Sequence, residues 1–360
     1  MPRRFRYPGH MTIAVALSGG ADSLFSLCLV REAGHPVLAV HGLLLPDSEA
    51  SRFLAGRLHA LCADLAVPFF AIDLRERFEA EVVAPFVREY ASGRTPNPCA
   101  VCNLKIKFGA LLDAARSLGA ERLATGHYAR TVGHPRFGAT LARGADTAKE
   151  QSYFLALVPG EVLAGAVFPL GGRFKKDALA ALAGFGVAPP LAVASQEICF
   201  VPRDDYQAFL LGRGVEAAGA GPVERRDGSV VGRHLGLWRH TEGQRRGLGI
   251  PAARPFYVLG KDRARNALIV GERQELLATG CRVRDPNLLV PPGLWPDEVL
   301  VQTRYRQKAA PARCEAAGDG LLVRFRDPQP RPAQGQVAAV YARDGTLLAG
   351  GVVADRAAAG

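Results

Sequence analysis

The sequence predicts an α/β protein in which a doubly wound parallel sheet domain precedes a small central domain and a C-terminal β-barrel. At 360 residues and 48% hydrophobic content, the chain is long enough for a sizeable core and for two or three domains. Over roughly the first two hundred residues, β-rich runs alternate with helical patterns, which is typical of βαβ units and a parallel sheet. Beyond Cys281, short alternating strands recur between Pro and Gly residues, which indicates an all-β module of barrel type.

The N-terminal elements follow one another in a regular order. A buried strand is expected at 12–17, and a glycine-rich loop joins it to a helix at 22–33. Ligands of such sheets bind at the carboxyl ends of the strands, so we expect a binding site where these strands end. Further strands are expected at 36–45, at 68–73 and near 122, with a helix at 50–65.

The remaining elements define the domain boundaries. A Gly- and Arg-rich stretch at 211–232 indicates a boundary rather than the interior of an element. We therefore predict a catalytic domain at 1–210, a small central domain at 211–275 and a β-barrel at 276–360. Barrel strands are expected within 298–307, 320–327, 335–343 and 346–353.

The charge balance indicates a polyanionic partner. Lys and Arg number 45 against 34 Asp and Glu, which gives a net charge of +11 and a pI near 9.6. Such a surface attracts nucleic acid, because each neutralised phosphate releases counterions. No apolar run is long enough for a membrane span or a signal peptide, so we expect a cytoplasmic protein with no membrane partner. The ten residues before Met11 match no motif, which makes Met11 a candidate start beside Met1.

The stretch AVALSGGADS at 14–23 predicts an anion-binding loop between the first strand and the first helix. Gly19 and Gly20 allow the backbone to approach a phosphate closely, and the helix N-terminus supplies unpaired N–H groups. Asp22 fits beside a phosphate when Mg²⁺ bridges the two, so the loop indicates a metal-bound nucleotide. The alternative is a Gly-Ser turn in which Asp22 is the helix N-cap. The Walker pattern is absent, as is a GxGxxG that follows a strand.

The seven cysteines, an odd number without a secretion signal, do not indicate a disulfide framework. Cys28 and Cys62 lie in apolar helical patterns and are expected to be buried. Cys99 and Cys102 form a CxxC with no second pair downstream, which makes a zinc site a weak hypothesis. Cys102 precedes a predicted helix, whose field is expected to lower the pKa of its thiol. Cys199 ends another strand-like run, and because strand ends of one parallel sheet converge, we expect it to approach Cys102.

Eight blocks of the sequence together resemble the bacterial tRNA-specific 2-thiouridylases, which belong to the ATP-pyrophosphatase (PP-loop) group. The blocks follow the family order from about residue 12 to residue 353, so the resemblance covers nearly the whole chain. They are SGGADS (18–23), TPNPCAVCNLKIKF (95–108), LATGHYAR (123–130), KEQSYFL (149–155), SQEICFV (195–201), TEGQRRGLGI (241–250), FYVLGKDRARNALIVG (256–271) and RYRQ (304–307).

The resemblance implies a PP-loop catalytic domain, a tRNA-contacting central domain and a C-terminal barrel. It implies that ATP with Mg²⁺ adenylates the C2 oxygen of wobble uridine 34 in tRNA and that sulfur then replaces this oxygen. Cys199 would hold a persulfide. The sulfur source of the reaction would be a sulfur-donor protein or sulfide. Cys102 would be its partner nucleophile, which either releases hydrogen sulfide or closes a disulfide with Cys199.

The motif matches also imply binding residues. His127 and the run 149–151 have a plainer alternative, a histidine hydrogen-bonded in the core and a solvated helix start. The implied ATP site comprises Ala16, Leu17, Ser18, Gly19, Gly20, Ala21, Asp22 and Ser23 with Gly42 and Gly126; the target-base site comprises Asn97, Pro98 and Cys99; and the tRNA contacts comprise His127, Lys149, Glu150, Gln151, Arg304, Tyr305 and Gln336.

Cys99 departs from the family pattern, because many members have Asp at this position. Cys99, Cys102 and Cys199 are therefore candidate ligands of a [4Fe-4S] cluster with one iron open to sulfide, and Cys99 alone is a candidate auxiliary sulfur handler. Two further alternatives have a different chemistry. One is a PP-loop ligase that adenylates its substrate and then uses ammonia or an amine, and the other is a noncatalytic RNA-binding module on the same scaffold.

Overall fold

The computed structural model describes residues 11–134, 136–191, 198–215, 219–251 and 253–354. The chain forms two compact units, each assembled from separate stretches of sequence. The first unit comprises Met1–Val82, Cys99–Gln196 and Gly345–Leu347, and the second comprises Val83–Pro98, Glu197–Asp344 and Leu348–Gly360. Residues 1–10, which include the alternative start Met1, lie outside the described residues.

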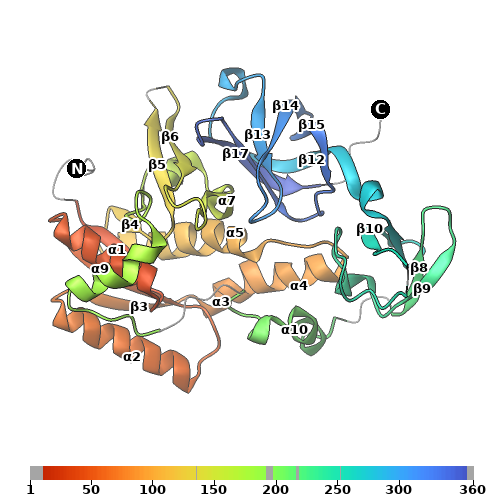
Figure 1. The fold of residues 1–360 in the computed structure, drawn as a ribbon. Helices are drawn as coiled ribbons and strands as arrows, with labels where there is room; N and C mark the ends of the chain where they lie inside the picture. The colour runs from red at the N-terminus through yellow and green to blue at the C-terminus, as the bar shows by residue number, and fades with distance from the viewer. Residues whose placement is uncertain (1–10, 135, 192–197, 216–218, 252, 355–360) are drawn as a thin grey trace. The chain divides into compact units, whose positions relative to one another are not determined.

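A five-stranded parallel sheet forms the centre of the first unit and confirms the predicted α/β fold (Figure 1). The chain builds outward from β1 through β2 and β3 on one side, then returns to place β4 and β7 on the other. The strand order therefore reverses between β1 and β4, which is the position where such sheets bind ligands. The strands are β1 (Ile13–Ala16), β2 (Val37–Leu43), β3 (Phe69–Asp73), β4 (Arg122–Ala124) and β7 (Ala166–Val167).

Helices α1 (Ala21–Glu32), α2 (Glu49–Asp64) and α9 (Ala178–Gly184) share one core cluster with the buried side chains of the sheet. Cys28 on α1 and Cys62 on α2 are buried in this cluster, as predicted. The other elements of the first unit are α3 (Arg75–Phe78), η1 (Glu79–Val83), α5 (Pro98–Cys102), η2 (Asn103–Leu111), α6 (Leu112–Ser117), the hairpin β5 (Ala129–His134) and β6 (Gly138–Arg143), α7 (Ser152–Leu155), α8 (Gly160–Leu163) and η3 (Lys175–Asp177). The last residue of η1, Val83, and the first residue of α5, Pro98, belong to the second unit.

The second unit contains a four-stranded sheet of order β10-β11-β8-β9. Its strands are β8 (Gly221–Glu224), β9 (Val230–His234), β10 (Tyr257–Asp262) and β11 (Ala267–Gly271). The stretch 211–232, predicted as a boundary, contains strand β8 and the start of β9. These strands form there because Val223 and Val231 pack on the apolar core of this sheet. The helical segments of this unit are α4 (Ala84–Ala91), η4 (Pro202–Asp204), α10 (Tyr206–Gly212), η5 (Leu237–Arg239), η6 (Arg273–Leu276) and η7 (Pro292–Leu294).

A closed barrel of order β12-β15-β14-β13-β16-β17 follows and confirms the predicted C-terminal β-barrel. Alternate residues of its strands, such as Val299 and Val301, are buried. The strands are β12 (Leu277–Leu288), β13 (Val299–Gln302), β14 (Ala310–Ala317), β15 (Gly320–Pro330), β16 (Val337–Tyr341) and β17 (Leu347–Val353).

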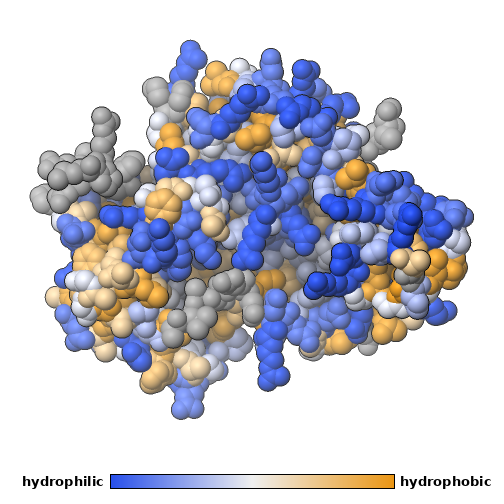
Figure 2. All heavy atoms as spheres, viewed as in Figure 1, coloured by the Kyte–Doolittle hydropathy of each residue, from blue (hydrophilic) through white to orange (hydrophobic). Residues whose placement is uncertain are grey.

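One face of the molecule carries mainly polar side chains. Hydrophilic side chains dominate the face shown in Figure 2, and apolar side chains appear there in separate groups. None of the helices in the described residues has both the length and the apolar character that crossing a bilayer requires.

Candidate functional site

The loop that follows β1, which the sequence predicts to bind an anion, is closed by its own hydrogen bonds. The Ser23 hydroxyl donates to the Gly20 carbonyl at 2.9 Å and accepts from the Ser18 backbone N–H at 3.1 Å. Gly19 has φ of +88°, a conformation that favours glycine. The loop leads directly into α1, whose first N–H groups lack intrahelical acceptors and whose dipole favours an anion. With the Ser18 hydroxyl exposed beside these donors, the loop suits a phosphate group.

Gly126 packs against this loop from the end of β4, as the strand order requires. A Cβ atom at Gly126 would lie 2.9 Å from the Asp22 carbonyl carbon and 2.9 Å from the Ser23 nitrogen. Only a residue without a side chain fits there, so the ends of β1 and β4 meet closely. Gly42 lies one residue before the end of β2, the strand beside β1, and its role next to adenosine stays a prediction.

Asp22 is the electrostatic centre of the loop. The N-cap of α1 is Gly20 and makes no side-chain cap, so the alternative in which Asp22 is the N-cap is wrong. Its carboxylate instead accepts from the Tyr128 hydroxyl at 2.9 Å and pairs with the Lys175 ammonium at 2.5 Å. Burial and the neighbouring Asp22 raise the pKa of Tyr128, which keeps its hydroxyl protonated as a donor.

Lys175 and Tyr128 are the residues of this site that the sequence analysis missed. Lys175 lies 153 positions from Asp22 and precedes α9 in a run of two lysines, a pattern that is common at exposed helix starts. The Lys175 backbone N–H also donates to Asp146 at 2.9 Å, which fixes the start of η3. A cation beside Asp22 adds positive charge at the place where phosphates are expected.

The thiol pair lies on α5. Cys99 is exposed, and Cys102 is half-buried at the last position of the helix. The expectation that a helix N-terminus lowers the Cys102 pKa is wrong, because burial raises the pKa of this thiol. Lys107, one turn further along the chain, opposes this rise and also disfavours a proton on His127. Lys107 is therefore a cation that can stabilise a thiolate at Cys102.

Cys199 does not end a strand of the parallel sheet. It is exposed, lies in a turn and belongs to the second unit, where the neighbouring Phe200 packs edge-on against Phe86 of α4 at 5.1 Å. This aromatic contact explains why the turn packs against α4 and does not extend a strand of the parallel sheet. Ser195, Gln196 and Glu197 lie outside the described residues. An encounter of Cys199 with Cys102 stays a prediction.

The iron–sulfur hypothesis gains no support. Within the described residues, no group of three or more His, Cys, Asp or Glu side chains is arranged to hold a metal ion. Cys99 and Cys102 supply two thiols of the first unit, whereas an Fe–S cluster is commonly held by four thiolates.

Two of the predicted tRNA contacts are largely internal. His127 is buried, and its Nδ1 lies 2.8 Å from the Thr125 hydroxyl oxygen, which favours the plainer alternative for this residue. Glu150 is also buried, accepts from the Ser152 N–H and pairs with Arg143 at 3.3 Å. The Glu150 contacts stabilise the region after β6, and a direct contact with RNA stays a prediction for both His127 and Glu150.

The other predicted tRNA contacts differ in exposure. The Gln151 side chain accepts from the Tyr128 N–H at 3.1 Å, and Lys149 is half-buried. After β13, Arg304 is exposed and Tyr305 is half-buried under the Arg306 guanidinium, 5.4 Å from its ring centre. Arg304 and Tyr305 thus lie where a phosphate or a base can reach them.

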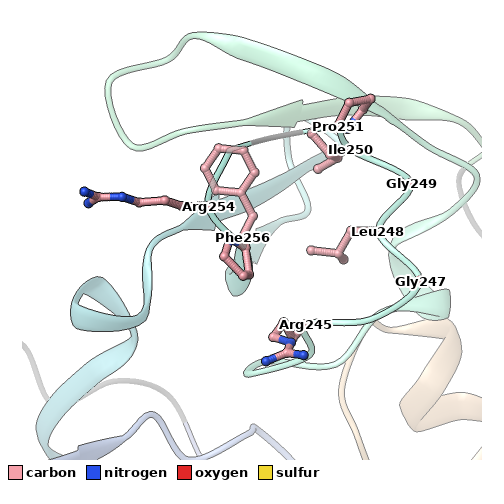
Figure 3. Close-up of a pocket in the computed structure, with 9 residues that line it drawn as sticks. Arg245, Gly247, Leu248, Gly249, Ile250, Pro251, Arg254 and Phe256 are labelled. Carbon is pink, nitrogen blue, oxygen red and sulfur yellow. The ribbon is translucent and has the colours of Figure 1, made fainter.

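A cavity of about 360 Å³ lies in the second unit, beside the segment that enters β10 (Figure 3). Leu248, Ile250 and Phe256 line it and pack on the core of the four-stranded sheet. Arg245 and Arg254 also line the cavity. The Arg254 side chain points away from the other side chains labelled in Figure 3 and pairs with Glu272 at 3.3 Å. None of the described residues that line this cavity is a cysteine.

Comparison with known proteins agrees with this arrangement. Three family models match in succession: tRNA methyl transferase HUP domain at 11–203, tRNA methyl transferase PRC-barrel domain at 207–272, and aminomethyltransferase β-barrel domain at 278–353. The chain is 55% identical to the tRNA-specific 2-thiouridylase MnmA of Nitratidesulfovibrio vulgaris strain Miyazaki F, over 95% of this chain and 99% of the relative. It is 52% identical to the protein of that name from Oleidesulfovibrio alaskensis, over 96% and 99%. The chain belongs to the tRNA-specific 2-thiouridylase family.

Proposed function

We propose that this protein catalyses ATP-dependent 2-thiolation of wobble uridine 34 in tRNA. The observation that supports it most is the anion loop between β1 and α1, with Asp22, Tyr128 and Lys175 at its edge, in a chain whose relatives are named for tRNA thiolation. The net charge of +11 suits a tRNA substrate. The cytoplasm is the proposed compartment, because tRNA and ATP are both available there.

The reaction has an activation step and a sulfur-transfer step. The C2 oxygen of the uridine bonds to the α-phosphorus of ATP, and pyrophosphate leaves. The terminal sulfur of a Cys199 persulfide then bonds to C2, and AMP leaves with the oxygen. The Cys102 thiolate attacks the Cys199 sulfur, which leaves 2-thiouridine and a Cys102–Cys199 disulfide. A thiol reductant reopens this disulfide, and a sulfur-donor protein renews the persulfide.

The residues of the anion loop fit ATP with Mg²⁺. The N–H groups at the start of α1 and the Ser18 hydroxyl can donate to phosphate oxygens. Asp22 supplies the carboxylate that Mg²⁺ prefers, and bound Mg²⁺ would neutralise phosphate charge during activation. The Lys175 ammonium lies 2.5 Å from the Asp22 carboxylate. It can stay on this carboxylate beside a bound Mg²⁺ or turn toward a phosphate.

Thiolation is favoured over two other reaction types. The matching family models are described by methyl transfer, but the curated relatives at 55% and 52% identity are named 2-thiouridylases. A PP-loop ligase that uses an amine has no need of the exposed thiols Cys99 and Cys199.

The test incubates the purified full chain with unmodified tRNA, ATP, Mg²⁺ and sulfide, and then measures tRNA nucleosides by mass spectrometry. We expect 2-thiouridine to form together with AMP and pyrophosphate. In a second reaction, a persulfide donor replaces sulfide. Cys199→Ser is expected to abolish turnover in this reaction, whereas Cys314→Ser, which changes a half-buried thiol of the barrel, should leave it intact. Pyrophosphate without 2-thiouridine, unchanged by Cys199→Ser, would indicate the amine ligase instead. Binding of tRNA without any pyrophosphate would indicate a noncatalytic module.

A further inference from the structure

The segment Gly93–Pro98, termed here the target-base segment, contains Asn97 and Pro98 and leads directly into the thiols of α5. Gln336, the residue before β16, donates from its Nε2 to the Thr95 carbonyl at 3.0 Å and to the Pro96 carbonyl at 3.2 Å. A primary amide nitrogen has two protons, and these two bonds account for both. The amide of Gln336 is thus bound to the backbone of this segment.

The residues before Gln336 reinforce this contact. The Thr95 N–H donates to the Gln334 carbonyl at 2.8 Å. Gly335 has φ of +90°, and a Cβ there would lie 3.0 Å from the Thr95 oxygen. The barrel backbone and the target-base segment therefore touch at a point where only glycine fits.

The four-stranded sheet region holds the same segment from other positions. The Lys261 ammonium, on β10, donates to the Gly93 carbonyl at 2.8 Å, and the Thr95 hydroxyl donates to the Thr241 hydroxyl at 3.3 Å. Burial lowers the pKa of Lys261 to about 8, so most of the side chain is still protonated at pH 7. Elements more than a hundred positions away in sequence thus fix a six-residue stretch of backbone.

We propose that Gln336 is a positioning residue, which holds the target-base segment in place for thiolation instead of acting mainly through contact with RNA. The inference rests on the proposed function and sharpens it. Without the Gln336 amide, the Thr95 and Pro96 carbonyls lose this donor. The next residues, Asn97 and Pro98, could then shift. Misplacement by about 1 Å at a reacting group can cost on the order of a hundredfold in rate.

The test compares Gln336→Met with Gln334→Met. Both replace an amide by an apolar chain of similar length, but Gln334 contacts the segment through its backbone, which the change retains. For Gln336→Met we expect kcat at saturating tRNA to fall about tenfold or more, with the Kd for tRNA changed less than threefold. Peptides covering 92–98 should also exchange amide hydrogens faster than in the parent protein, a readout that is independent of activity.

Gln336→Glu is the second variant, to be used if Gln336→Met does not fold. It keeps the side-chain shape but places a carboxylate against two carbonyl oxygens, so faster exchange and a lower kcat are again expected. A Kd for tRNA raised tenfold with kcat unchanged would overturn the proposal in favour of direct RNA contact. Equal behaviour of Gln336→Met and Gln334→Met would also overturn it. Failure of thiolation in the parent protein would refute the proposed function alone, because hydrogen exchange still tests the positioning.

Discussion

The anion loop and the target-base segment are held in place in different ways. The hydrogen bonds that close the loop, such as those of Ser23 with Ser18 and Gly20, join residues no more than five positions apart. The target-base segment depends on Thr241, Lys261 and Gln336, which lie 146 to 241 positions away from their partners. The hydrogen bonds that close the anion loop are thus local in sequence, whereas the target-base segment depends on the assembly of distant elements. Changes at the two places should have separable effects.

Asp22→Asn tests the independence of the anion loop and has the largest expected effect. The amide removes the charge that pairs with Lys175 and that would hold Mg²⁺, so pyrophosphate release should fall on the order of a hundredfold. The Kd for tRNA should stay within about twofold, because the bonds that fix the target-base segment are untouched. Pyrophosphate release and filter binding measure the two quantities.

Asp113→Asn is the control for Asp22→Asn, because Asp113 is an exposed carboxylate on α6 with one weak ion pair at 3.7 Å. It should leave both measurements unchanged. A large loss of tRNA affinity in Asp22→Asn would show that the anion loop and the target-base segment are coupled, against the comparison.

Gly126→Ala tests the close packing of β4 on the anion loop. The added Cβ meets backbone atoms at 2.9 Å, so the loop must shift, at a cost of about 1–3 kcal/mol. We expect the KM for ATP to rise about tenfold. Gly133→Ala, in β5, is the matched control, because a Cβ there meets nothing within 4 Å. An unchanged KM in Gly126→Ala would place the nucleotide elsewhere.

The difference between local and long-range contacts also explains which features could be predicted from the sequence. The anion loop, β1 and α1 were predictable, because Gly19, Gly20 and Asp22 form a contiguous motif between a strand and a helix. The partners Lys175 and Tyr128 were not, because only folding brings them to Asp22. Cys199 was assigned to a strand end, yet the packing of Phe200 on Phe86 places it in a turn of the second unit. A pattern of apolar residues does not specify which distant partner an aromatic ring will find.

Lys107→Met tests the charge beside the thiol pair and should have a smaller effect. Burial holds the pKa of Cys102 above its usual value, so the thiolate fraction and the alkylation rate should rise with pH through the alkaline range. Loss of the Lys107 cation removes the opposing influence, which raises the pKa further and moves the profile to higher pH. Alkylation of Cys102 by iodoacetamide, followed by mass spectrometry, should be roughly threefold slower at pH 7.

Lys105→Met is the control for Lys107→Met, because Lys105 lies on the same helical segment but is exposed and does not affect the Cys102 pKa. Its profile should match that of the parent protein. An identical shift in both variants would mean that overall charge, and not the position of Lys107, governs the thiol.

Arg245→Gln tests whether the cavity of the second unit contributes to tRNA binding, and it has the smallest expected effect. Arg245 lines the cavity of Figure 3 and has no ion-pair partner among the described side chains, so its charge is available to a phosphate. Removing one phosphate contact should weaken tRNA binding by about twofold and reduce the slope of log Kd against log salt concentration by about 1. Arg254→Gln should change both less, because the Arg254 guanidinium already pairs with Glu272 at 3.3 Å. Pyrophosphate release at saturating tRNA should be equal in both variants and the parent protein, whereas a lower rate in Arg245→Gln would mean that this cavity, too, takes part in placing the target base.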